Sequence, residues 1–132
     1  MKKIVEFFGK CPCFEGKRVC EDFLAPKSGC VAIAYDGGAS SVKVYASGDS
    51  LEQICFKLML REAFTGQAGR LFGELRQWLA EGKEKLPEIP GKGRVQYIEI
   101  ADGPALIKTE VGAGIYEMKF RLVYYRKGAG NE

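Results

Sequence analysis

The chain has 132 residues, 46% hydrophobic and 28% charged, which is the composition of an ordinary globular domain. Its 20 basic and 17 acidic residues are dispersed and leave a net charge of +3, whereas a dedicated nucleic-acid-binding protein clusters its basic residues. No apolar run approaches the roughly 20 residues that span a bilayer, and Gly9, Lys10 and Cys11 end the first apolar stretch too early for a signal peptide. We expect one domain over residues 1–132, made and kept in a cytoplasm and without a membrane partner.

The N-terminal segment is predicted to form one short helix followed by irregular structure. Ile4, Phe7 and Phe8 are spaced i, i+3, i+4, which is the pattern of an amphipathic helix over Lys2–Phe8. Prolines and glycines interrupt the chain throughout Gly9–Gly29, so no regular element is expected there.

Five cysteines allow two interpretations: Cys11, Cys13, Cys20, Cys30 and Cys55. An odd number in a chain without a secretion signal argues against a disulfide framework. A zinc site built from the first four stays open, although structural zinc normally uses pairs spaced C-x2–4-C and the chain has no histidine to complete a mixed site. The simpler expectation is a set of small, buried or partly buried thiols.

Three strands are expected in the middle of the chain. Cys30–Tyr35 and Val42–Tyr45 flank the turn residues Asp36–Gly38, and this arrangement predicts a hairpin. After a second break at Ser47–Ser50, apolar and polar residues alternate over Gln53–Arg61, which is the pattern of a strand with one buried face.

A change of period after Gly69 predicts the main helix. Its apolar residues follow the i, i+1, i+4, i+7, i+8 spacing of a helix that packs one stripe on a core: Leu71, Phe72, Leu75, Trp78 and Leu79. We place this helix at about residues 68–84 and interpret Trp78 as a core residue rather than a binding platform. A linker rich in proline and glycine follows at 86–93.

The C-terminal third is predicted to form three strands, Val95–Ala101, Leu106–Val111 and Ile115–Arg126, joined by short turns at 102–104 and 112–114. Over most of the last strand every second residue is large and apolar, and charged residues stand between them. Such alternation describes a sheet with one dry and one wet face, and a charged wet face favours antiparallel pairing. We therefore predict an α+β domain: an antiparallel sheet of five or six strands, one main helix packed on one face and a short N-terminal helix.

Residue patterns that support catalysis are few. The chain contains no histidine, so neither a Ser-His-Asp nor a Cys-His arrangement can form within it. The loop Gly91–Arg94 lacks the spacing of a phosphate-binding P-loop, and Gly112–Gly114 joins two predicted strands rather than a strand and a helix. We predict that the protein is not an enzyme and uses no cofactor or metal.

Several short motifs together resemble a known family. They are Cys11-Pro12 after the short helix, Val44-Tyr45 with the break at 47–51, Gln53 and Phe56, Arg61-Glu62, Leu75–Leu79, Leu86-Pro87, and Tyr116–Met118 with Arg121–Tyr125. With these positions, the chain from about Phe7 to Arg126 resembles the small minor capsid or tail terminator-like proteins encoded in tailed phages and prophages of Firmicutes. The Asp36–Ser41 turn and the N-terminal cysteines depart from that pattern.

The resemblance implies a structural virion protein with a tail terminator-like fold. Such a subunit forms a ring of six copies at the head-proximal end of the tail, caps the tail tube, stops its polymerisation and joins the tail to the head-side connector. The implied partners are other copies of the chain, the tail tube protein and the connector or neck protein. A contact with the genome DNA that passes through the ring stays open. The implied site of synthesis is the cytoplasm of the bacterial host.

Under this interpretation, the charged face of the sheet is where contacts are expected. The residues expected at the oligomer or tube interface are Glu117, Lys119, Arg121, Lys57 and Arg61. The alternative is that the same side chains form an ordinary solvated face.

Two other functions stay open. One is a different component of the same particle, such as a neck or head-completion protein or a tube-like subunit. The other is a small zinc-dependent module that contacts nucleic acid through Lys10, Lys17, Arg18 and Lys27.

Overall fold

The computed structural model describes residues 2–26, 29–37, 40–82, 85–88 and 94–128. Its elements in chain order are α1 (Lys2–Gly9), the 3-10 turn η1 (Pro12–Phe14), β1 (Val19–Glu21), β2 (Val31–Tyr35), β3 (Ser40–Val44), β4 (Ser50–Glu62), α2 (Thr65–Glu81), β5 (Arg94–Glu110) and β6 (Ala113–Arg126). The described strands form one six-stranded sheet in the order β1-β2-β4-β6-β5, with β3 also paired to β4. The chain therefore has the predicted α+β fold, with one main helix and one short N-terminal helix.

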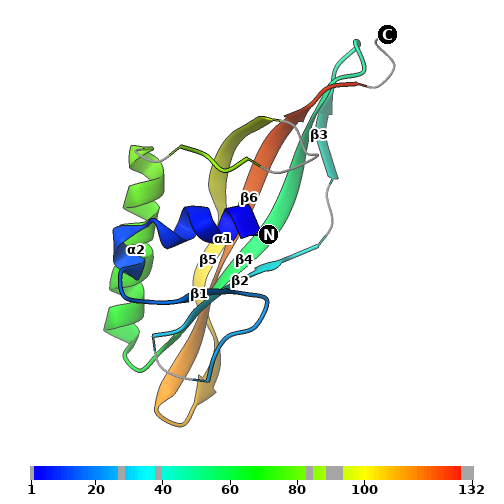
Figure 1. Ribbon diagram of the computed structural model, residues 1–132. Coiled ribbons are helices and arrows are strands. Elements are labelled where there is room, and N and C mark those ends of the chain that lie inside the picture. The colour runs from blue at the N-terminus through cyan, green and yellow to red at the C-terminus, as the bar shows by residue number, and fades with distance from the viewer. Residues whose placement is uncertain (1, 27–28, 38–39, 83–84, 89–93, 129–132) are drawn as a thin grey trace.

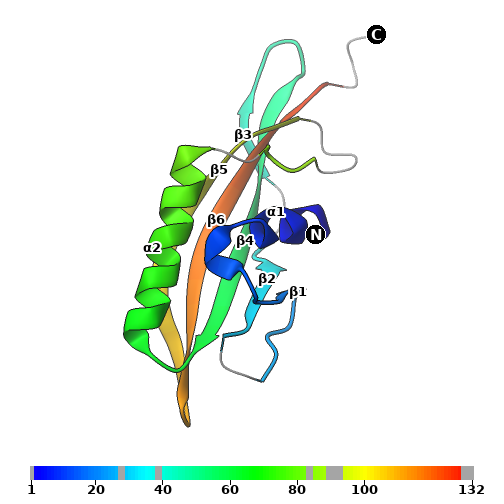
Figure 2. The same ribbon diagram turned by 60° about the vertical axis from the view of Figure 1, so that its left-hand side comes forward.

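Both helices lie on the same face of the sheet, where α2 runs along it and α1 crosses it (Figures 1 and 2). Aromatic rings join the two helices to the central strands. Phe8 of α1 packs on Phe56 and Phe120, with ring centroids 5.7 and 5.1 Å apart. Trp78 of α2 contacts Phe7 at 5.0 Å. The core therefore sits between the helices and the β4–β6 pair, and the half-buried Trp78 packs against it.

The dry face predicted for the last strand is confirmed. Antiparallel pairing of β4 with β6 sets large buried residues opposite one another: Ile54 and Leu122, Phe56 and Phe120, Leu58 and Met118, Leu60 and Tyr116. Burying each such side chain stabilises the fold by roughly 1.5–3 kcal/mol. This pair is the centre of the sheet and fixes which side chains point outward.

Helix α2 is shifted toward the N-terminus relative to the predicted 68–84. It starts at Thr65, directly after Phe64, which has extended backbone angles. It ends at Glu81 because Gly82 adopts a left-handed conformation, with φ of 62°, that stops the helix. The predicted residues 83–84 lie outside the described part of the chain.

The predicted hairpin between residues 30–35 and 42–45 does not form. β2 and β3 both pair with β4, at Tyr35 opposite Phe56 and Ser40 opposite Gln53, so they lie end to end rather than side by side. The reason is the length of β4, which at 13 residues accommodates both strands along one edge. The true hairpin is β3–β4, closed by the Tyr45 N–H donating to the Asp49 carbonyl at 2.8 Å.

The two strands predicted at 95–101 and 106–111 are one strand, β5. The turn residues at 102–104 shift its register without reversing it, because Asp102 and Ala105 both pair with β6. Gly103 has φ of 91°, and a Cβ there would lie 2.7 Å from the Glu117 carbonyl oxygen, so only glycine fits. The turn chemistry therefore marks a bulge within a long strand.

The segment 9–29, predicted as irregular, contributes η1 and β1. β1 runs parallel to β2, with Val19 opposite Val31 and Glu21 opposite Ile33. The sheet is therefore mixed, and the prediction of an all-antiparallel sheet is wrong at this edge. A strand of three residues is too short for alternation to reveal it.

Candidate functional site

Four of the five predicted interface residues meet on the outer face of the β4–β6 pair. Lys57, Glu117, Lys119 and Arg121 each stand between buried residues of their strand, so they point away from the helices. Lys57 is directly opposite Lys119 in the register. The structure therefore gathers these charges into one surface, which we name the ionic face.

The charges of the ionic face differ in whether they are paired. Lys119 Nζ lies 3.5 Å from an Asp36 carboxylate oxygen, and Arg121 Nη1 lies 2.9 Å from a Glu99 carboxylate oxygen. Among the described residues, Lys57 and Glu117 have neither an ion pair nor a hydrogen bond. These two side chains are thus the ones free to meet a partner.

Arg61, the fifth predicted residue, is used inside the fold. Its guanidinium forms an ion pair with Glu110 near the end of β5, and its Nε donates to the Ala25 carbonyl at 3.0 Å. The side chain is only 15% exposed. It lies four residues from Lys57 along β4, about 13 Å away at the rise of an extended strand. Arg61 therefore ties the loop after β1 to the sheet, away from the centre of the ionic face.

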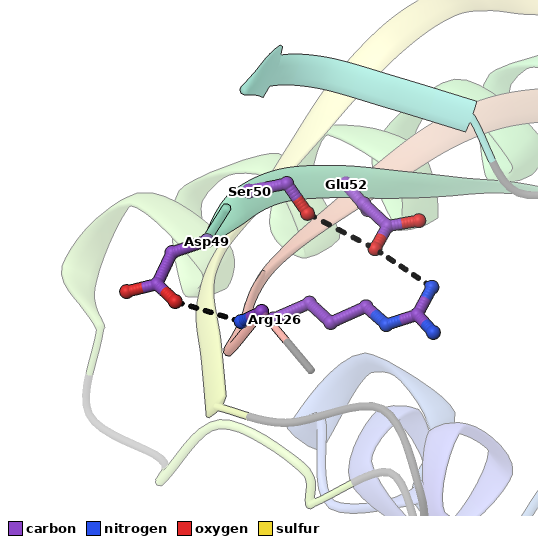
Figure 3. Close-up of polar contacts among 5 residues, drawn as sticks. Asp49, Ser50, Glu52 and Arg126 are labelled. Atoms are coloured by element: carbon purple, nitrogen blue, oxygen red, sulfur yellow. Dashed lines mark hydrogen bonds and ion pairs between the residues drawn. The ribbon is translucent and has the colours of Figure 1, made fainter. Parts of the chain in front are cut away.

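A polar cluster at the opposite end of β4 holds the C-terminal segment. The Asp49 carboxylate accepts a hydrogen bond from the Tyr125 hydroxyl. It accepts another, at 2.7 Å, from the backbone N–H of Gly128 (Figure 3). The bond to Asp49 raises the pKa of Tyr125 above its usual value, because a tyrosinate would face a carboxylate. The contact joins the β3–β4 turn to the end of β6.

Ser50, Glu52 and Arg126 complete this cluster (Figure 3). One Glu52 oxygen accepts from the Ser50 hydroxyl at 3.2 Å and from Arg126 Nη1 at 3.4 Å. A hollow of about 310 Å³ opens beside these three side chains. The Glu52 carboxylate is thus engaged by both the Ser50 hydroxyl and the Arg126 guanidinium. The arrangement therefore suits fastening the chain end better than nucleophilic chemistry.

The cysteines do not assemble as a zinc site would require. Cys11 and Cys13 are buried with their sulfurs 2.9 Å apart, whereas Cys20 and Cys30 lie on the β1–β2 edge, each half-buried. Among the described residues, no three Cys, Asp or Glu side chains gather in a metal-binding group. The thiols are free, and Cys55 is half-buried on the outer face of β4.

The basic residues considered for nucleic-acid contact differ in exposure. Lys10 and Arg18 are exposed and Lys17 is half-buried. Lys27 lies outside the described residues.

The turn end of the β5–β6 hairpin projects beyond the start of α2 (Figures 1 and 2). Large apolar side chains are uncovered there: Leu106 is 54% exposed, Ile107 51% and Val111 fully exposed. We name these three residues the hairpin tip. Phe64, at the nearby start of α2, is also exposed. These uncovered apolar side chains make the turn end of the hairpin a candidate contact surface.

No protein-family model and no curated protein matches this chain. The function must therefore be inferred from the surfaces described above and from the motifs of the sequence. In the part of the chain that the structure describes, no helix is both long and apolar enough to cross a membrane.

The hairpin tip and the Asp49 cluster were not foreseen from the sequence. Leu106–Val111 was predicted as an ordinary strand, because nothing local shows that the helices stop short of it. The sequence of Ser47–Ser50 indicates only a break, because Tyr125, the residue that bonds Asp49, is 76 residues away. Two consecutive large apolar residues, Leu106 and Ile107, were the one available sequence signal for the hairpin tip.

Proposed function

We propose that this protein is a tail terminator: a structural virion subunit that closes into a ring of six copies, caps the tail tube and stops its polymerisation. The observation that carries the proposal is a sheet with unpaired charge on its ionic face and an uncovered apolar hairpin tip outside its core. A contact with another subunit removes both kinds of surface from water. The role is structural rather than enzymatic.

The positions of these surfaces support self-assembly by contacts between unlike patches. The hairpin tip lies at one end of the long strands and the Asp49 cluster at the other (Figure 1). If the hairpin tip of one copy contacts a different surface of the next copy, the contact is heterologous. Repeated heterologous contacts form a ring when the rotations between neighbouring subunits add up to a full turn. The ionic face then remains for the tail tube protein and for the head-side connector.

The proposal places the subunit in the virion, at the head-proximal end of the tail. A neck or head-completion component of the same particle is the second candidate, because it would also need subunit contacts of this kind. The two differ in what they do to a growing tube. A terminator binds the free end and stops growth, whereas a neck component does not.

Mixing the purified chain with polymerising tail tube protein tests the proposal. We expect closed single rings of the chain alone or on tube ends by negative-stain electron microscopy, and tubes that stop growing once the rings are added. Extended tubes built from the chain itself, or unchanged tube growth at saturating amounts, would refute a terminator function. Lys57→Glu serves as a matched variant, since it alters only an unpaired side chain of the ionic face.

A further inference from the structure

Two thiols meet in the short connection between α1 and η1. Cys11 Sγ and Cys13 Sγ are 2.9 Å apart, a hydrogen-bond contact in which either thiol can be the donor. A disulfide has a sulfur–sulfur bond of about 2.05 Å, so the sulfurs need to approach by less than about 1 Å. Cys20, Cys30 and Cys55 show no such contact among the described residues. The pair is therefore set apart from the other thiols by geometry.

A hollow adjoins the pair. It has a volume of about 230 Å³ and lies against α2, lined by Cys11, Pro12, Cys13, Glu74, Trp78 and Glu81, with Gln77 beside them. Both cysteines are less than a tenth exposed, so a bulky reagent is hindered. A hydroperoxide as small as hydrogen peroxide is little larger than water and fits easily. Access thus favours a small oxidant.

The chemistry of the pair is asymmetric. The hydrogen bond from the Cys13 thiol lowers the pKa of Cys11, although burial and the Glu74 carboxylate oppose this effect. The same bond, with burial, raises the pKa of Cys13. The thiolate is the nucleophilic form of cysteine, so Cys11 is the sulfur that reacts first and Cys13 the one that follows.

We propose that Cys11 and Cys13 form a redox site at which a hydroperoxide oxidises the two thiols to an intrachain disulfide. The Cys11 sulfur attacks one peroxide oxygen, the O–O bond breaks, and water leaves with the thiol proton, so that Cys11 becomes a sulfenic acid. The Cys13 sulfur then attacks the Cys11 sulfur, the S–O bond breaks, and a second water leaves with the Cys13 proton. Two thiols lose two electrons, which reduce one hydrogen peroxide to two waters. In a reducing cytoplasm the pair stays a dithiol.

Mass spectrometry of the folded, fully reduced chain after treatment with equimolar hydrogen peroxide tests the site. We expect the peptide that carries Cys11 and Cys13 to lose the mass of two hydrogen atoms, to resist alkylation after the chain is unfolded in denaturant, and to recover with dithiothreitol. The triple variant Cys20→Ser, Cys30→Ser and Cys55→Ser should behave identically, because it leaves the pair intact.

A single variant separates the two steps. In Cys13→Ser, Cys11 should stop at the sulfenic acid, gain the mass of one oxygen and react with dimedone, a sulfenic-acid trap. The proposal is overturned if, after peroxide treatment and unfolding in denaturant, wild-type Cys11 and Cys13 are still alkylated while Cys20, Cys30 or Cys55 are oxidised. It is equally overturned if the disulfides formed link different cysteines or different chains. The wild-type readout does not depend on how well any variant folds.

Discussion

Lys57 and Lys119 stand directly opposite each other on β4 and β6, yet only Lys119 has an acidic partner, Asp36 at 3.5 Å. Like charges at directly opposite positions destabilise an antiparallel pair. Lys57 can therefore be changed to test the ionic face without breaking an ion pair among the described residues.

Changing Lys57 to Glu should separate assembly from folding. The new carboxylate would face Lys119, so the free energy of unfolding in urea should stay equal or rise by up to about 1 kcal/mol. Ring formation, measured by sedimentation velocity, should be unchanged, whereas the ability of the rings to stop tail tube growth should fall. Lys3→Glu is the control, since it makes the same charge change at an exposed position on α1. If the Lys57→Glu variant stops tube growth at the same amounts as the wild type, the ionic face is merely solvated.

Phe120 should be essential for stability, whereas Phe23 should not. Phe120 is fully buried and stacked on Phe56 with centroids 5.4 Å apart, while Phe23 is 83% exposed. Phe120→Ala should lower the free energy of unfolding by about 3–5 kcal/mol, and Phe23→Ala by less than about 0.5 kcal/mol. Chemical denaturation monitored by circular dichroism measures both. Similar losses for the two variants would contradict the assigned core.

Arg61 should contribute to stability more than an exposed arginine does. Arg61→Gln removes the positive charge that pairs with Glu110 and the donor of the hydrogen bond to the Ala25 carbonyl. We therefore expect the free energy of unfolding to fall by about 1–3 kcal/mol. Arg70, whose exposed side chain lies 3.9 Å from Glu74, provides the control, and Arg70→Gln should cost less than about 1 kcal/mol. Thermal unfolding compares the two. Equal losses would mean that Arg61 does not hold the loop after β1.

The hairpin tip should be needed for assembly only. Val111 is fully exposed, so Val111→Asp should change the free energy of unfolding by less than about 0.5 kcal/mol while abolishing rings in negative-stain images. Val44→Asp, at an exposed valine of β3 near the other end, is the matched control. If Val44→Asp abolishes rings and Val111→Asp does not, the contact lies at that opposite end.

Tyr125 should make stability fall in alkali. Its pKa is raised in the folded state, so the stabilising effect of the protonated hydroxyl is complete below the unfolded value of 10.0 and is lost as pH rises through the higher folded value. The melting temperature should therefore drop above pH 10 more steeply in the wild type than in Tyr125→Phe. Parallel pH profiles would show that the bond to Asp49 does not form in solution.

Much of the secondary structure could be predicted, because the information is local. The alternation around Phe120 and the stripe through Leu75 follow from strand and helix geometry and need no knowledge of neighbours. Gly82 likewise ends α2 by a property of its own backbone. The one-sided sheet and the location of Lys57, Lys119, Arg121 and Glu117 on its outer face follow directly from these periods.

Which strands pair with one another was decided only by the tertiary structure. Backbone hydrogen-bonding groups are the same in almost every residue, so the sequence around Asp36 or Gly103 does not show whether a turn reverses the chain or merely shifts it. The length of β4 placed β2 and β3 end to end, and continuous contact with β6 made β5 one strand. The residues themselves determined the faces of the sheet. The folded chain determined which charges are free. Arg61 donates a hydrogen bond to the Ala25 carbonyl, 36 residues away in the sequence, whereas Lys57 has no ion-pair or hydrogen-bond partner among the described residues.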